Sequence, residues 1–85
     1  MEALNRVFCL VVQEGSSQNL IGVFSTSDEA RNEIDRLERR GTLFYIQERL
    51  IDTTGEPAYE IEVKYCPMGR KSEMIVTRNS IENIN

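Results

Sequence analysis

The chain has 85 residues, of which 40% are hydrophobic and 28% are charged, a composition typical of folded globular domains and not of disordered or fibrous proteins. Two separate cores would each be too small to be stable, so residues 1–85 are expected to form a single domain. The net charge of −4 disfavours nonspecific attraction to nucleic acid or to an anionic membrane.

The longest uninterrupted apolar run, at residues 7–12, has six residues and is too short to cross a bilayer. The first residues also lack the basic segment of a secretory leader, so we expect a cytoplasmic protein. The chain has no histidine, and its two cysteines, Cys9 and Cys66, have neither the number nor the spacing of a disulfide framework or a zinc site. We expect free thiols, no metal, no cofactor and no enzymatic activity.

Two strands are predicted at the start of the chain. Residues 6–13 are apolar at both odd and even positions, which is typical of a central strand covered on both faces. Residues 14–19 are rich in glycine, serine and asparagine and are expected to form a hairpin loop, followed by an antiparallel strand at 20–24. Gly22 in this strand indicates a bulge or a close approach of the helix backbone to the sheet.

A helix is predicted directly after this hairpin. Residues 26–29 fit a capping box, in which the Thr26 hydroxyl accepts from the Glu29 amide and the Glu29 carboxylate reaches back to the Thr26 amide. Arg39 and Arg40 are expected in the last turn, and Gly41 is expected to be the left-handed C-cap.

The charges of this helix are expected to form a solvent-exposed face. Opposite charges lie at helical spacing in the pairs Asp35–Arg39 and Glu33–Arg36. The apolar stripe is narrow, so the helix can shield only one face of a sheet. It consists of Ala30, Ile34 and Leu37.

Three further strands are predicted, at residues 42–51, 59–65 and 73–77. The first is apolar on both faces, whereas the second alternates strictly between apolar and charged residues and should be buried on one face only. Its water-facing residues would be Glu60, Glu62 and Lys64. Residues 79–85 are expected to be a frayed tail or a short helical turn.

These elements predict an α+β fold, with a largely antiparallel sheet of four to five strands, one helix on one face and the order β-β-α-β-β, with a possible fifth strand. The other face would be uncovered, and its apolar area would exceed what soluble monomers leave in water. Depending on register, it would carry either the odd or the even residues of the two central strands. The interface candidates chosen for a sheet-on-sheet homodimer are Phe8, Leu10, Val12, Phe44 and Ile46.

Other candidate sites are weaker. The loop 66–72 would lie at the rim of the interface, with Cys66, Arg70 and Lys71 as candidates, although a reactive thiol there would have no histidine as a base. Arg70, Lys71 and Arg78 form a local basic patch that could contact phosphates, with Tyr65 available for stacking. A solvated loop is the favoured explanation of this patch, because the net negative charge works against binding of a polyanion. Glu60 and Glu62 are explained as the wet side of a strand.

The segment 23–30, Val-Phe-Ser-Thr-Ser-Asp-Glu-Ala, resembles a loose group of small uncharacterised bacterial and phage domains. In that group a strand hairpin ends in V-F-S-x-x-x-E-A, a helix follows, and a strand returns with a pattern such as the one at 45–48. The resemblance covers about half of the chain. It implies the β-β-α-β order and a prokaryotic or viral setting, and it implies no functional residues.

These observations favour a small non-catalytic protein-binding module. In a phage or mobile-element setting, we expect it to be an inhibitor or regulator of a host protein. The alternative is a dimeric regulatory domain that binds a small molecule in a pocket lined by Tyr45, Tyr59 and Tyr65. A weak nucleic-acid-binding protein is the third interpretation, with Arg70 and Lys71 as the contacting residues.

Overall fold

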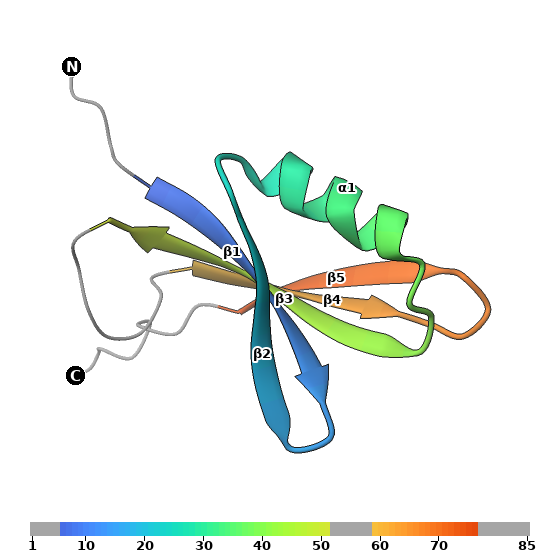
Figure 1. Ribbon diagram of the computed structural model, residues 1–85. Coiled ribbons are helices and arrows are strands. Elements are labelled where there is room, and N and C mark those ends of the chain that lie inside the picture. Colours follow the sequence, from blue (N-terminus) through green and yellow to red (C-terminus); the bar gives the residue numbers. More distant parts are fainter. Residues whose placement is uncertain (1–5, 52–58, 77–85) are drawn as a thin grey trace.

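The computed structural model describes residues 6–51 and 59–76. It contains an antiparallel five-stranded sheet and one helix among these residues, so the predicted α+β class is confirmed (Figure 1). In chain order the elements are β1 (Arg6–Glu14), β2 (Ser17–Phe24), α1 (Ser27–Leu37), β3 (Thr42–Leu50), β4 (Tyr59–Tyr65) and β5 (Lys71–Val76). The predicted tail at 79–85 lies outside the described residues. Within the described ranges, no helix is long and apolar enough to span a membrane.

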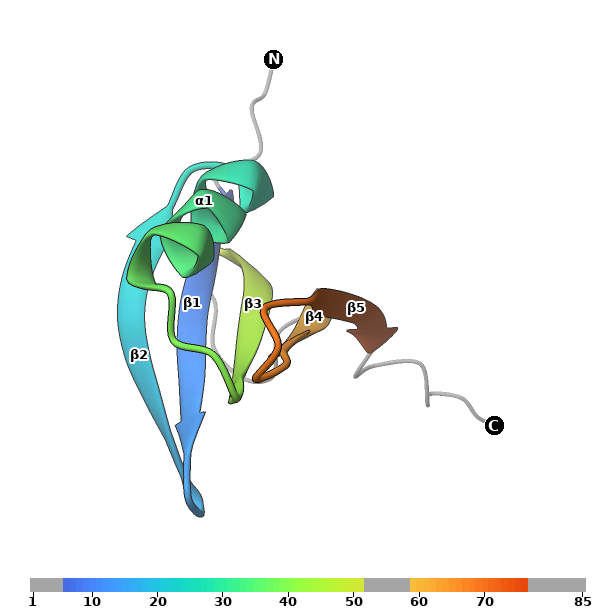
Figure 2. The ribbon, with the colours of Figure 1, turned by 90° about the vertical axis from the view of Figure 1, so that its right-hand side faces the viewer.

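The strands lie in the order β2-β1-β3-β4-β5, and each neighbouring pair is antiparallel. Both β2 and β3 are antiparallel to β1, so they run parallel to each other on either side of it. Helix α1 connects them, and this connection carries it across one face of β1. Figure 2 shows α1 over the β2–β1 side of the sheet, with β4 and β5 beyond β3.

The face under α1 holds the core. Cross-strand pairs align Leu10 with Ile46 and Ile46 with Ile61, and the same register aligns Val12, Phe44 and Val63 in the next row. Ala30 and Ile34 of α1 pack on these rows and are at most 1% exposed. The even residues of β1 and β3 and the odd residues of β4 therefore point toward the helix.

Helix α1 begins as predicted but ends earlier. Thr26 is the N-cap, and its hydroxyl accepts from the Glu29 amide at 3.1 Å, whereas the Glu29 carboxylate accepts from the Ser25 hydroxyl. The C-cap is Glu38 in the left-handed conformation (φ 52°, ψ 40°), so the prediction of Gly41 as the cap is wrong. The chain leaves the helix because the Gly41 amide donates to the Tyr65 carbonyl at the end of β4.

The β1–β2 hairpin is longer than predicted. Strand β2 starts at Ser17, which pairs with Glu14, so only residues 15 and 16 form the turn instead of a loop over 14–19. Side-chain amides of Gln18 and Asn19 bond to Gln13 and Glu14 across the hairpin, which explains how such a polar segment forms a strand.

The register of the hairpin shifts beside Gly22, which confirms a bulge there. Leu10 of β1 pairs with Gly22, and the next residue, Val11, pairs with Leu20, so Ile21 is the additional residue. A Cβ at Gly22 would lie 2.7 Å from the ring of Phe24. The close neighbour of Gly22 is therefore this ring and not the helix backbone.

Candidate functional site

The interface set chosen from the sequence lies on the covered face of the sheet. Leu10, Val12, Phe44 and Ile46 are at most 1% exposed beneath α1, and Phe8 is half-buried against the same core. The β1–β3 register and the position of α1 place these even-numbered residues toward the helix. These five residues are core, and the choice of them as a contact surface is wrong.

The opposite face carries the odd residues of β1 and β3 instead, and we call it the open face. Among the described residues, no second layer of secondary structure lies over it. Its apolar part is formed by β2, β1 and the start of β3, with Leu20 60% and Val23 54% exposed. We call this set the apolar patch, and it comprises Val7, Cys9, Val11, Leu20, Val23, Leu43 and Tyr45.

The apolar patch borders a shallow groove. The groove is lined by Cys9, Val11, Gln18, Leu20, Gln47 and Arg49, which come from three adjacent strands. Its floor is formed by Val11, which is only 8% exposed, while Leu20 stands at the edge strand. The groove is open and mixed in polarity, which suits contact with another surface better than enclosure of a small molecule.

A buried polar cluster lies next to the groove. Glu60 is 0% exposed, and its carboxylate accepts a hydrogen bond of 2.8 Å from Nε2 of Gln47, which is 9% exposed. Arg49 Nε donates in turn to Gln47 Oε1 at 3.4 Å. The prediction that Glu60 points to water is wrong, because the open face is polar but not solvated at this position. Of the predicted wet side, Lys64 is exposed and Glu62 half-buried.

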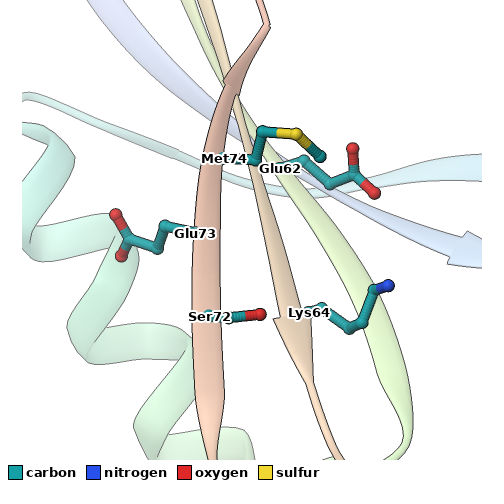
Figure 3. A pocket seen from close by; sticks show the side chains of 5 residues that line it. All are labelled: Glu62, Lys64, Ser72, Glu73 and Met74. Carbon is teal, nitrogen blue, oxygen red and sulfur yellow. The ribbon is translucent and has the colours of Figure 1, made fainter.

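A second shallow pocket lies between β4 and β5, lined by Glu62, Lys64, Ser72, Glu73 and Met74. Figure 3 shows Glu73 pointing toward α1, whereas the other four side chains lie on the opposite side of the two strands. The pocket is lined by acidic and basic side chains on open strands, so it offers no apolar enclosure.

The three tyrosines proposed as a ligand pocket do not share one face. Tyr59 and Tyr65 point toward the core, where Tyr65 is 7% exposed, whereas Tyr45 belongs to the open face. The β3–β4 register causes this separation, because Tyr59 pairs with Glu48, an odd number of residues from Tyr45. One chain therefore cannot line a pocket with all three.

The rim-loop candidates have different environments. Cys66 is half-buried and Arg70 is exposed at the loop, while Lys71 begins β5 and forms an ion pair with Asp35 of α1. Lys71 also lies over the Tyr65 ring, with Nζ 5.9 Å from its centroid. The patch of Arg70, Lys71 and Arg78 is thus not a set of free cations, and Arg78 lies outside the described residues.

Ion pairs connect α1 to β5, and the segment after α1 to the β1–β2 hairpin. Arg31 forms two hydrogen bonds to Glu73 of β5, at 2.8 and 3.2 Å, and these raise the pKa of its guanidinium. The predicted pair Glu33–Arg36 is present, and its hydrogen bonds lower the pKa of Glu33. The predicted pair Asp35–Arg39 is replaced, because Asp35 binds Lys71 and Arg39 binds Glu14 at 2.9 Å.

Fold and surface together define an α+β domain with one covered and one open sheet face. Over the described ranges, no group of His, Cys, Asp or Glu is arranged to hold a metal ion. Comparison with models of protein families finds no match, and neither do comparisons with curated proteins and with solved structures. The open face is therefore the feature of the molecule from which a function can be inferred.

Proposed function

We propose that this protein is a non-catalytic protein-binding module of the cytoplasm of a bacterium or phage-infected cell, and that it associates through its open face with a second copy of itself. The observation that carries the proposal is the exposure of Leu20 and Val23, at 60% and 54%, beside the apolar floor of the groove. Apolar side chains gathered on one face favour an interface.

The charge distribution supports a second copy as the occupant. The chain has a net charge of −4, so most of its surface repels its own copy. The open-face residues of β1 and β2 are neither acidic nor basic, because they are Val7, Cys9, Val11, Gln13, Gln18, Leu20 and Val23. Two copies related by a two-fold axis can bring these strands together without opposing like charges.

The size of the open face limits the area of a dimer interface. Five strands about 4.8 Å apart, with six to nine residues at about 3.4 Å each, form a face of about 24 by 25 Å. This projected area of about 600 Å² covers all five strands, so it is an upper limit for a contact centred on β1 and β2, compared with the roughly 800 Å² per partner of a standard interface. The dimer would then present α1 outward on both sides, which leaves the helix faces for regulating another protein.

The test is the mass in solution of the natural chain and of the double variant Leu20→Lys, Val23→Lys. Light scattering during size exclusion should give twice the chain mass for the natural protein and one chain mass for the variant, because the two lysines place like charges in the interface. Ile75→Lys is the matched control, since Ile75 is also 60% exposed but lies on the other face, and this variant should remain a dimer.

The free thiols give a second measurement. Cys9 is on the open face and Cys66 is in the β4–β5 loop, so dimerisation should slow the alkylation of Cys9 and leave that of Cys66 unchanged. The double variant should remove this protection. A natural chain that stays a single protomer at millimolar concentration, or a control that dissociates equally, would contradict the proposal.

A further inference from the structure

Three basic side chains at one end of the sheet have no acidic partner. Most cations of the described residues are neutralised within the chain, as the pairs Arg6–Glu48, Arg31–Glu73, Arg36–Glu33, Arg39–Glu14 and Lys71–Asp35 show. Among the basic residues in the described ranges, Arg40, Lys64 and Arg70 form no ion pair. These three side chains are therefore available to an acidic group from outside the chain.

Arg40 and Arg70 lie at the loop between β4 and β5, whereas the side chain of Lys64 lies on the open face of β4, where Lys64 pairs with Leu43 (Figure 3). Arg40 immediately precedes Gly41, whose amide donates to the Tyr65 carbonyl. The Arg40 guanidinium carbon lies 3.3 Å from the position that a Cβ on Gly69 would occupy, so it rests on the β4–β5 loop. Figure 1 shows this loop beside the connection from α1 to β3. Arg70 is the last residue of the loop, and Lys64 lies two residues before the loop begins at Cys66.

The loop itself is a fixed turn that presents an apolar side chain. The Cys66 amide donates to the Arg70 carbonyl at 2.8 Å, and the Gly69 amide donates to the Cys66 carbonyl at 2.9 Å. Gly69 has φ 93°, which a glycine adopts without strain. Met68 is 92% exposed at the tip, and a shallow hollow lined by Cys66, Met68 and Arg70 lies beside it.

We propose that this cationic loop cluster, Arg40, Met68 and Arg70, binds an acidic segment of a partner protein in which carboxylates flank an apolar or aromatic side chain. Guanidinium groups bind carboxylates with directed hydrogen bonds, and an exposed methionine adapts to apolar and aromatic side chains. The inference does not depend on the dimer, because β3 separates the β4–β5 loop from β1 and β2, which carry Leu20 and Val23.

The structure favours a protein segment over a nucleic acid. Tyr65, the aromatic residue nearest the loop, is 7% exposed and packs in the core, so it cannot stack on a base. Lys71 is held by Asp35. Two arginines on a chain of net charge −4 attract a short acidic segment, whereas a long polyanion would also meet the rest of the acidic surface.

The probe is a pool of capped hexapeptides of aspartate and glutamate with one central phenylalanine or leucine, titrated into isotope-labelled protein and followed by amide chemical shifts. We expect saturable shifts confined to residues 40–41 and 64–70. Arg40→Gln combined with Arg70→Gln should weaken binding at least tenfold, and Met68→Ser about threefold. The control combines Arg6→Gln with Arg36→Gln, which changes the net charge equally, and should stay within twofold of the natural chain.

Three results would overturn the inference. The first is the absence of saturable shifts at these residues with millimolar peptide, and the second is an equal loss of affinity in the control, which would indicate attraction by net charge alone. The third is tighter binding of a thymidine dodecamer than of the peptides at the same residues, which would make the cluster a nucleic-acid site. None of these results changes the mass measurement on the open face, so the two proposals fail separately.

Discussion

Glu14 links the tip of the β1–β2 hairpin to the segment after α1. Its carboxylate accepts hydrogen bonds from Arg39, at 2.9 Å, and from the side-chain amide of Asn19. The bond from Arg39 is the main cause of a pKa below the ordinary value, and the bond from Asn19 adds to it. Sequence reasoning paired Arg39 with Asp35, because helical spacing reveals neighbours within one element and not partners across the fold.

Replacing Arg39 by glutamine should raise the pKa of Glu14 toward its ordinary value. Since the folded-state pKa is lowered, the pair stabilises the fold above the ordinary carboxyl pKa, and this contribution is lost as the pH falls through the lowered value. Carboxyl carbon shifts followed by NMR between neutral and acid pH measure the change. Arg36→Gln is the control, because it should raise the pKa of Glu33 and leave Glu14 unchanged.

Among the elements, α1 shows where local signals were sufficient and where they were not. The Thr26 cap was predictable from four consecutive residues. The end of the helix was not, because residues 38–40 are charged and are favourable in helices. A bond to another strand, from Gly41 to Tyr65, draws the chain away from the helix axis, and Glu38 adopts the left-handed conformation as a result.

Glu38→Gly should stabilise the protein by about 1 kcal/mol, because glycine removes the steric cost of a side chain in the left-handed region. Thermal unfolding gives the measurement. Glu38→Ala is the matched control, since alanine removes the carboxylate but keeps the Cβ, and it should bring no gain. Equal stability of the two variants would show that Glu38 is not strained.

The strands, too, could be predicted only in part from the sequence. Apolar patterning was sufficient to locate β1, β3 and β4, since continuous apolar runs mark β1 and β3 and strict alternation marks β4. It could not determine which face is open, because β1 and β3 are apolar on both faces. Strand β4 is apolar on one face only, so it was the strand that could identify the covered face. Its apolar face must join the core, but the β3–β4 register that pairs Ile46 with Ile61 spans a separation that turn chemistry does not specify.

At the scale of the whole molecule, helix α1 covers only part of the sheet. Helix α1 packs against β2, β1 and β3, whereas β5 is joined to it through Arg31–Glu73 and Lys71–Asp35. Met74 and Ile75 of β5 are 59% and 60% exposed, so this strand contributes little to the core. Local stability should therefore fall from β1 and β3 toward β5.

Arg31→Gln should loosen β5 selectively. The two hydrogen bonds from Arg31 to Glu73 are partly exposed, so their loss should cost at most about 1 kcal/mol, which lowers the protection of β5 amides by up to about fivefold. Native-state hydrogen exchange measures this protection strand by strand. Amides of β1 and β3 should change little, and Arg36→Gln should affect none of the strands.

The attachment of β5 to the helix has a consequence for solution conditions. The Debye length shrinks from about 10 Å at 0.1 M salt to about 3 Å at 1 M, and partly exposed ion pairs weaken as it does. The apolar contacts beneath α1 are not weakened in this way. High ionic strength therefore weakens the attachment of β5 to α1, while the apolar packing beneath the helix is retained.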